Sequence, residues 1–462
     1  MKVIPRSRRF LVWLLLSLLV AMLVTMLAAI VADHGWVDAK TLLRKPSLRR
    51  LDPALFEQAQ RDATTFAMPG EFEPIESMWM AYPVYENVHG RPSQTVQADM
   101  IKALVPHTSI DLLVQDPSEQ TQVQQWLAGM NLPSDRVRLH IVPHTDIWMR
   151  DMGPIFLQNA AGKQKIADFG FSTWSYNEPT HADAMTDEAV DRLIARDLKL
   201  PILRSSLISE GGNREFNGKG TLIVTEAVEL QRNLGMSKAD IEAELKRVFR
   251  LKKVIWLKQG LADDDLSTKG QLPGGIFTVL TTGGHIDEFA RFVNPTTILL
   301  AQVTPQERDE DPISRITYDR MEENYRILRA ATDQDGKPFT IIRVPIAAPL
   351  YQAMDERDQV FRLLQGLTFE DGSVIPAGRT INTILAASYL NFVVANDVVL
   401  LPAYWQPGRS ETIRQKDAAV KRIFQQVFPD RRIVPINPEN INVGGGGMHC
   451  IVQQMPALPT QP

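Results

Sequence analysis

The chain has 462 residues, of which 44% are hydrophobic and 23% charged, and these values exclude a collagen-like, disordered or low-complexity protein. Lysine and arginine number 50 against 54 aspartates and glutamates, so the net charge of −4 argues against a nucleic-acid partner. The single cysteine, Cys450, excludes an internal disulfide framework and is either a buried filler or a nucleophile.

An uncharged, apolar run covers residues 10–32. At about 1.5 Å per residue, a helix of this length crosses the ~30 Å hydrocarbon layer of a membrane. The basic segment 1–9 before it favours an amino end in the cytoplasm and export of the rest. We therefore expect a transmembrane signal-anchor with the following chain on the periplasmic or extracellular side. A cleaved signal peptide, and hence secretion, is the alternative.

Residues 33–66 are predicted to form a solvated linker, and beyond them strand-like runs alternate with helical stretches. This succession indicates an α/β or α+β domain of enzyme size. Strands are expected at 78–82, 110–114, 137–142, 222–224, 254–257, 298–303, 340–344, 392–394 and 398–401. Helices are expected at 96–105, 118–128, 182–198, 237–249, 318–331 and 410–427, with a capping arrangement between Ser237 and Asp240.

Two short segments in the first half of the domain suggest a site for a cation. Trp148 lies close to Asp151 before a Gly-Pro turn, and a cationic ligand can stack on an indole while it pairs with a carboxylate. An Asp-Arg ion pair beside a core tryptophan is the alternative. The segment Glu210-Gly211-Gly212-Asn213 follows a strand-like run, and its glycines either bring Glu210 close to a ligand or form a simple turn.

Two further glycine-rich segments carry groups that move protons or attack carbon. On a strand, His285 and Asp287 of GGHID would face the same side, as a proton-transfer pair or as a structural one. Four glycines precede Met448-His449-Cys450, and such a loop favours the nucleophile interpretation of the cysteine. A metal site at His140 and His144 is disfavoured, because Pro143 lies between them in a strand-like segment.

These segments, in this order, resemble the agmatine deiminase and bacterial (Porphyromonas-type) peptidylarginine deiminase family of guanidine-modifying enzymes. The resemblance begins at MPGEF from Met68, runs through WMRDMGP, EGGNREFNGKGT and GGHIDEFARF, and ends with GGGGMHCIVQQMP. It implies one catalytic domain over residues 67–462 with the pentein fold. That fold is a five-bladed α/β propeller of ββαβ-type units, preceded in this chain by the predicted transmembrane helix.

The resemblance also implies hydrolysis of a guanidinium group to a ureido group with release of ammonia, without a metal or an organic cofactor. By position, Cys450 corresponds to the nucleophile and His285 to the general acid/base. Asp151 and Asp287 correspond to the carboxylates that bind the guanidinium, and Glu210 to a further acid that orients His285 or the substrate. We also expect Trp148 to pack against the substrate and Asn391 to hydrogen-bond near its chain.

The chain departs from the family pattern at several positions. Gly283 stands where Asp is common, Glu288 follows the HID triplet where Asn is usual, and Asn217 replaces a common Asp. The segment 261–282 before His285 is also unusually long. Because the five nominated polar residues are intact, we expect activity. The departures bear on the choice of substrate.

The expected partners are a small cationic guanidinium substrate and, through residues 10–32, a membrane, while the oligomeric state stays open. Agmatine, which would give N-carbamoylputrescine and ammonia, is the favoured substrate because the motif wording is closest to that branch. A peptidylarginine or arginine deiminase is the close alternative. A binding protein that captures guanidinium compounds without turnover is an alternative from another class, and an amidinotransferase is a third.

Overall fold

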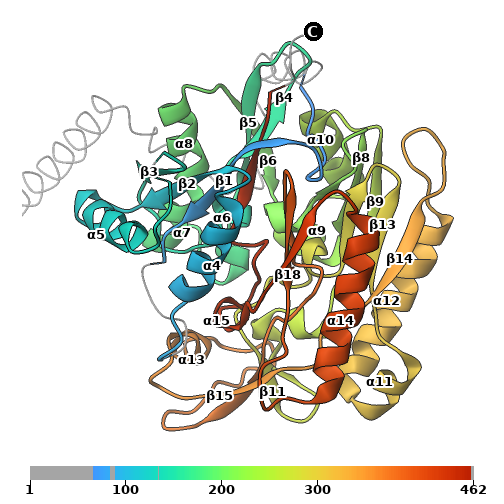
Figure 1. The fold of residues 1–462 in the computed structure, drawn as a ribbon. Coiled ribbons are helices and arrows are strands. Elements are labelled where there is room, and N and C mark those ends of the chain that lie inside the picture. Colours follow the sequence, from blue (N-terminus) through green and yellow to red (C-terminus); the bar gives the residue numbers. More distant parts are fainter. Residues whose placement is uncertain (1–65, 84–88, 134, 459–462) are drawn as a thin grey trace, which may run out of the picture. The chain divides into compact units, whose positions relative to one another are not determined.

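The structure is a computed structural model, and it describes residues 66–83, 89–133 and 135–458 (Figure 1). Within these residues, no helix is both long enough and apolar enough to cross a membrane. This finding corrects the predicted transmembrane anchor and the location derived from it. The predicted span, residues 10–32, lies outside the described residues, as do segment 1–9 and all of 33–66 except Phe66.

The described strands form six separate sheets. Four sheets have three strands each: β4 (Ile155–Gln158), β5 (Gln164–Gly170) and β6 (Ile202–Ile208); β7 (Glu215–Phe216), β8 (Thr221–Thr225) and β9 (Lys253–Leu257); β12 (Ala290–Asn294), β13 (Thr297–Gln302) and β14 (Thr340–Pro345); β17 (Val393–Ala395), β18 (Val398–Pro402) and β19 (Arg432–Ile436). Two sheets have four strands, here in spatial order: β20 (Gln453–Pro456), β1 (Ile75–Ala81), β2 (Ser109–Val114) and β3 (Val137–Ile141); β10 (Gln271–Leu272), β11 (Ile276–Thr278), β16 (Ile381–Ile384) and β15 (Tyr351–Met354).

Helices connect and cover these sheets. The α-helices are α4 (Gln94–Leu104), α5 (Pro117–Ala128), α6 (Met149–Met152), α7 (Ala182–Glu188), α8 (Val190–Leu198), α9 (Glu226–Arg232), α10 (Lys238–Phe249), α11 (Pro305–Glu310), α12 (Pro312–Ala330), α13 (Gln359–Gln365), α14 (Glu411–Val427) and α15 (Glu439–Asn442). The 3₁₀ turns are η2 (Thr173–Ser175), η3 (Gly211–Asn213), η4 (Ala262–Asp264), η5 (Ser267–Lys269) and η6 (Ile286–Glu288).

The three-stranded sheets share one connection pattern. In each, the first two strands are antiparallel neighbours, and the third pairs parallel to the second after a helical crossover. A parallel neighbour requires such a crossover, because the chain must return to the starting edge before it pairs. Helix α12 packs on β13, and α14 contacts both β19 and β14 (Figure 1). The α/β class and the ββαβ-type unit were therefore predicted correctly.

The predicted five-bladed propeller is wrong. The described strands form six sheets instead of five blades, and no strand ladder within the described residues joins one sheet to the next. The additional sheet arises where the chain departs from the regular unit. Its strands β10 and β11 come from the long segment before His285, and β15 and β16 flank an excursion after β14.

Local sequence explains where the longer helices begin. Ser237 and Asp240 form a reciprocal capping box at the start of α10, as predicted. Helix α12 begins at Pro312, earlier than the predicted Tyr318, because the Asp311 side chain accepts from the Ser314 main-chain N–H and proline suits the first turn. Strands β8 and β18 are buried along their whole length, as expected for central strands next to a parallel neighbour.

Candidate active site

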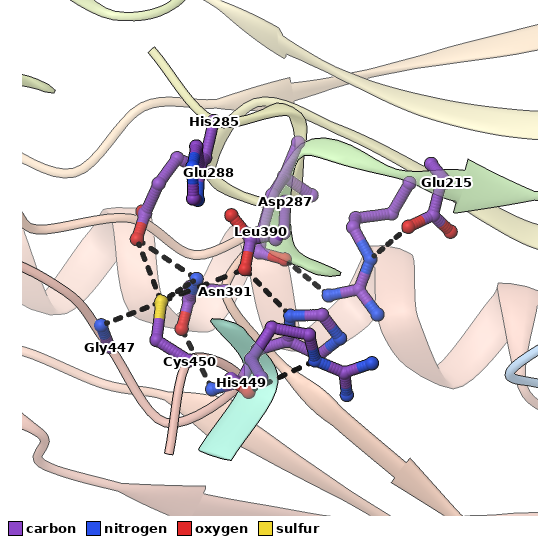
Figure 2. A network of polar contacts seen from close by, with 12 residues as sticks. Glu215, His285, Asp287, Glu288, Leu390, Asn391, Gly447, His449 and Cys450 are labelled. Atoms are coloured by element: carbon purple, nitrogen blue, oxygen red, sulfur yellow. Dashed lines mark hydrogen bonds and ion pairs between the residues drawn. The ribbon is translucent and has the colours of Figure 1, made fainter. Parts of the chain in front are cut away.

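Five connections of the fold meet at one buried place, and each lies just before the first strand of a sheet or, for β20, before the strand that pairs with β1. Asp151 precedes β4, Gly212 precedes β7, Asp287 precedes β12, Asn391 precedes β17 and Cys450 precedes β20. The repeated connection pattern therefore brings one short polar segment from each of these sheets to the same point. Figure 2 shows part of this gathering, around Cys450 and Asp287.

Cys450, the predicted nucleophile, is buried at 2% exposure. Its Sγ lies 3.2 Å from the Asn391 Nδ2 and 3.4 Å from the Gly447 main-chain nitrogen. The thiol also faces carboxylate oxygens of Asp287 at 3.6 Å and Glu288 at 3.7 Å (Figure 2). Burial raises the pKa of this thiol well above its usual range, and both carboxylates raise it further. A cation bound among these groups would oppose that effect and favour the thiolate.

His285 is fully buried between two carboxylates. Its Nδ1 lies 3.7 Å from the Asp151 Oδ2, and its Nε2 lies 3.5 Å from the Glu210 Oε2. Burial lowers the pKa of His285, but Asp151 and Glu210 outweigh burial and raise that pKa to about 9. The imidazole is therefore protonated at neutral pH and can supply a proton to a leaving group.

Asp151 is held by two neutral donors. The main-chain N–H of Gly212 donates to its Oδ1 at 2.9 Å, and the indole N–H of Trp174 donates to its Oδ2 at 2.8 Å. Burial raises the pKa of Asp151 above its usual range, and Asp287 and Glu210 add to this effect, which His285 opposes only in part. The Trp174 ring packs edge-on against Trp148, with ring centroids 6.2 Å apart. Trp148, predicted to contact the substrate, thus lies next to a residue that orients Asp151.

Gly212 lies where His285, Asp151 and Asp287 approach one another. A β-carbon on Gly212 would lie 2.5 Å from the His285 Nδ1 and 3.0 Å from the Asp151 Oδ1. The same β-carbon would lie 3.2 Å from the Asp287 Oδ2. Only glycine leaves this space free, because the surrounding groups approach too closely for any side chain at this position.

Glu210 is buried at 0% exposure against Arg232. The Arg232 Nε donates to the Glu210 Oε1 at 2.8 Å. Burial raises the pKa of Glu210, but Arg232 and His285 outweigh burial and lower that pKa to about 2. Glu210 therefore stays ionised over the physiological range and provides a fixed negative charge beside His285.

A second histidine, His449, supports Asp287 and was not predicted. Its Nδ1 lies 2.7 Å from the Asp287 Oδ2, and its Nε2 lies 2.8 Å from the Glu71 Oε2. Glu71 also accepts from the Arg150 Nη1 and the Arg291 Nη2, each at 2.6 Å. Burial raises the pKa of Asp287, but the hydrogen bond and the charge of His449 outweigh it and lower that pKa.

These supporting residues were visible in the sequence as charged neighbours of nominated ones. Arg150 precedes Asp151, His449 precedes Cys450, and Glu71 belongs to the MPGEF segment. Arg291 and Glu215, which form a buried ion pair at 3.0 Å, lie in the GGHIDEFARF and EGGNREFNGKGT segments. The sequence signal for these supporting residues was therefore their charge, because they lie inside the motifs that contain the nominated site residues.

The backbone at GGHID differs from the prediction. His285 and Asp287 do not lie on a strand: residues 286–288 form the 3₁₀ turn η6, and His285 directly precedes it. Gly283 and Gly284 have φ values of 90° and 110°, which a strand does not adopt. The Asp264 Oδ2 accepts from the main-chain N–H of His285 at 3.0 Å and so fixes the entry to the turn.

The remaining nominated residue, Asn391, links Cys450 to Glu288. Its Nδ2 donates to the Glu288 Oε1 at 2.9 Å as well as to the Cys450 Sγ, and its Oδ1 accepts from the His449 main-chain N–H at 2.8 Å (Figure 2). One potential ligand atom each of Asp287, Glu288 and Cys450 lies within 4.8 Å of the others. Buried anionic and thiol groups this close together suit a cation, organic or inorganic.

His140 and His144, which the sequence disfavours as metal ligands, have other contacts. The His140 Nε2 lies 2.7 Å from the Asp111 Oδ1, within the β1–β2–β3 sheet. The His144 Nδ1 lies 2.8 Å from the main-chain oxygen of Val142. Both rings thus take part in local structure.

The sequence of the chain is similar to a known family and to curated proteins. Residues 67–456 match the model of a family described as Porphyromonas-type peptidyl-arginine deiminase. An agmatine deiminase of Pseudomonas aeruginosa is 30% identical over 405 residues, which cover 86% of this chain and 96% of the relative. An agmatine deiminase of Medicago truncatula is 30% identical over 408 residues, covering 85% of this chain and 97% of the relative.

A solved structure shows the same fold. The agmatine deiminase of Enterococcus faecalis, solved as catalysing its reaction, superposes with a TM-score of 0.66 at 26% identity. The superposition covers 86% of this chain and 97% of that one. The similarity therefore extends over nearly the whole of the described residues.

Proposed function

The chain belongs to the Porphyromonas-type peptidyl-arginine deiminase family, and from that premise we propose that it hydrolyses agmatine to N-carbamoylputrescine and ammonia. At the coarser level, it is a hydrolase that acts on C–N bonds and deiminates a guanidino substrate. One observation carries the proposal: Cys450, His285 and three buried carboxylates converge on one point.

The carboxylates of Asp151 and Asp287 bind the substrate cation. A guanidinium is planar and always charged, and its N–H groups form forks that a carboxylate can accept in pairs. The Asp287 Oδ1 is buried without a hydrogen-bond partner among the described residues, which leaves an acceptor for such a fork. With both edges held, the central carbon lies over the Cys450 sulfur. Trp148 packs against the bound cation or its chain.

The first half of the reaction forms a covalent intermediate. The Cys450 thiolate attacks the guanidinium carbon, and the resulting tetrahedral adduct loses ammonia. His285 donates the proton that the departing nitrogen needs, because its raised pKa keeps the ring charged at neutral pH. A Cys450 amidino-thioether remains, and His285 is now neutral.

The second half releases the product. Neutral His285 accepts a proton from a water molecule, and the hydroxide adds to the amidino carbon. Collapse of this adduct breaks the C–S bond, so that the ureido product leaves and the cysteine is restored. Glu210 keeps His285 oriented through both halves, since the two side chains lie 3.5 Å apart and Glu210 is itself fixed by Arg232.

The experiment is a measurement of ammonia released by the purified chain from agmatine, free arginine and a peptide with a C-terminal arginine. We expect turnover with a preference for agmatine, and Cys450→Ser should bind agmatine but release no ammonia. Preference for arginine or the peptide would assign the chain to the peptidylarginine or arginine deiminase alternative.

Two other outcomes would replace deimination altogether. Stoichiometric agmatine binding without ammonia release would indicate a binding protein. Product formation that depends on an added amine acceptor would indicate an amidinotransferase. Turnover retained by Cys450→Ser would contradict the role of the cysteine.

A further inference from the structure

The thiol of Cys450 needs a group that accepts its proton before the sulfur can attack. Two carboxylates lie within reach of the sulfur, Asp287 at 3.6 Å and Glu288 at 3.7 Å. Both belong to the turn η6, so their distances to the sulfur are fixed by one short piece of backbone. The two differ in their other contacts, and that difference decides between them.

Asp287 is the weaker base of the two. The oxygen that faces the thiol, Oδ2, already lies 2.7 Å from the His449 Nδ1. His449 lowers the pKa of Asp287 in spite of burial, so this carboxylate holds a proton poorly. Its role in binding the substrate cation also requires the ionised form.

Glu288 has no cation among its described hydrogen-bond and ion-pair partners. Its Oε1 accepts from a neutral amide, the Asn391 Nδ2, at 2.9 Å and from the Cys450 thiol (Figure 2). Burial raises the pKa of Glu288 well above its usual range, and Asp287, Asp264 and Asp263 raise it further. The titratable groups that face it are Asp287 on its own turn, Asp263 and Asp264 on η4, the Tyr404 phenol and the Cys450 thiol.

His285 is not available for this step. Its ring nitrogens face Asp151 at 3.7 Å and Glu210 at 3.5 Å, and its proton is the one that the departing ammonia needs. A protonated imidazole has no acceptor site. The proton of the thiol therefore needs another acceptor.

We infer that Glu288 is a catalytic residue that accepts the Cys450 proton when a guanidinium or amidinium cation enters the site. The S–H bond breaks, an O–H bond forms on the Glu288 carboxylate, and the negative charge moves to sulfur, where the bound cation stabilises it. The total charge of the pair is unchanged, so no proton has to enter from solvent. The inference rests on the proposed function for its substrate class, and it assigns a use to a residue that replaces the family's usual asparagine.

The test is alkylation of Cys450 by 2-chloroacetamidine, a cationic amidine, in the wild type and in Glu288→Gln. At neutral pH we expect the variant to react on the order of 100-fold more slowly, because it has lost its general base. The deficit should narrow as the pH rises, since hydroxide in solvent then removes the thiol proton. Glu323→Gln, which changes an exposed glutamate, should react like the wild type. Equal rates for Glu288→Gln and the wild type at neutral pH would overturn the inference.

A second measurement uses the wild type alone and does not depend on the folding of a variant. Because Cys450 is the only cysteine, the infrared S–H band of the protein belongs to it. Acetamidine, an amidine without a leaving group, should remove this band and add the C=O band of a protonated carboxyl group, at a concentration that blocks labelling by chloroacetamidine. An S–H band that persists, or that disappears without a carboxyl band, would refute the transfer.

Neither readout requires turnover of agmatine. A wild type that releases no ammonia but shows Glu288-dependent alkylation would refute the proposed function and keep this inference. The reverse result is turnover of agmatine together with equal alkylation rates in the wild type and Glu288→Gln. It would refute the inference alone.

Discussion

Asp151 combines a buried charge with two neutral hydrogen-bond donors, Gly212 and Trp174. Asp151→Asn removes the negative charge and replaces one of the two acceptor oxygens by an NH₂ group. This NH₂ group would face the N–H of Gly212 or Trp174, so the side chain must move. We expect KM for agmatine to rise and kcat/KM to fall by at least about 100-fold, because a misplaced substrate reacts slowly. Steady-state ammonia release measures this. Asp430→Asn, on an exposed aspartate, should change neither constant, and an unchanged kcat/KM in Asp151→Asn would remove Asp151 from the site.

The raised pKa of His285 sets the alkaline limit of the first half-reaction. Burial lowers this pKa, while Asp151 and Glu210 raise it to about 9, so the proton for ammonia is present below pH 9 and lost above it. We expect the rate of the ammonia burst to fall as the pH passes about 9. Because the charge of Glu210 contributes to the shift, Glu210→Gln should move this limb toward neutral pH. If the alkaline fall in rate occurs at the same pH in Glu210→Gln as in the wild type, a group other than His285 supplies the proton.

His285 and Asp287 lie in one buried site, as expected from the sequence, but their backbone differs from the prediction. A strand places residues i and i+2 on one face, whereas a 3₁₀ helix aligns residues i and i+3, so the spacing of His285 and Asp287 gave no indication of the turn. The positive φ values of Gly283 and Gly284 decide for the turn, and they depend on hydrogen bonds to Asp264, which is distant in sequence. Likewise, Asp287 owes its lowered pKa to His449, a contact that no local pattern reveals.

The turn η3 presents Gly212 to three side chains of the site. In Gly212→Ala, the new β-carbon would lie 2.5 Å from the His285 Nδ1, so the imidazole must move away from its carboxylates. We expect kcat to fall on the order of 100-fold, with a stability loss of about 1–3 kcal/mol from overpacking. Activity assays and thermal melting of the same sample separate the two effects.

The matched control is Gly129→Ala at the end of α5. A β-carbon there would lie 3.4 Å from the Trp126 main-chain oxygen, and the glycine already has helical φ and ψ. This variant should keep both activity and melting temperature. If Gly212→Ala were equally harmless, the close approach at η3 would not constrain the site.

Across the whole described chain, Glu71 holds together segments that are far apart in sequence. It contacts Arg150, Arg291 and His449, all of them buried. Glu71→Gln would leave the buried Arg150 without its carboxylate partner, whereas Arg291 keeps Glu215 and His449 keeps Asp287. We expect a loss of about 3–5 kcal/mol in the free energy of unfolding at pH 7. Urea unfolding measures it. Glu73→Gln, which removes only a partly exposed pair with Lys219, should cost about 1 kcal/mol or less.

The pH dependence of this effect has a defined sign. Although burial raises it, Arg150 and His449 hold the pKa of Glu71 well below 4.5, so the folded state favours the carboxylate. Its contribution is fully present above the unfolded pKa near 4.5 and disappears as the pH falls through the folded value. The stability gap between the wild type and Glu71→Gln should therefore narrow in acid. If the difference in the free energy of unfolding between the two proteins did not change with pH, the loss of stability would come from packing and not from charge.

Alternating strands and helices indicated an α/β or α+β domain, and the family resemblance implied ββαβ-type units, whereas neither predicted how the sheets are assembled. The segment before His285 is long enough to form β10 and β11, and β11 pairs with β16, so that these strands join β15 and β16 in a sheet of their own. Strands of two or three residues, such as β10 and β11, carry too little periodicity to be recognised in a sequence. Their pairing depends on neighbours contributed by distant segments.

The antiparallel pairing of β1 with β20 has a consequence for synthesis of the chain. Residue pairs such as Trp79 and Gln453 join the beginning and the end of the described residues, and Cys450 lies in the segment just before β20. A growing polypeptide emerges from the ribosome with β1 first, so the edge that receives β20 stays uncovered until nearly all the other strands exist. Cys450 and the last strand then arrive together. Every shorter nascent chain therefore carries an open strand edge and an incomplete site, which makes this edge the place where chaperones or aggregation would act.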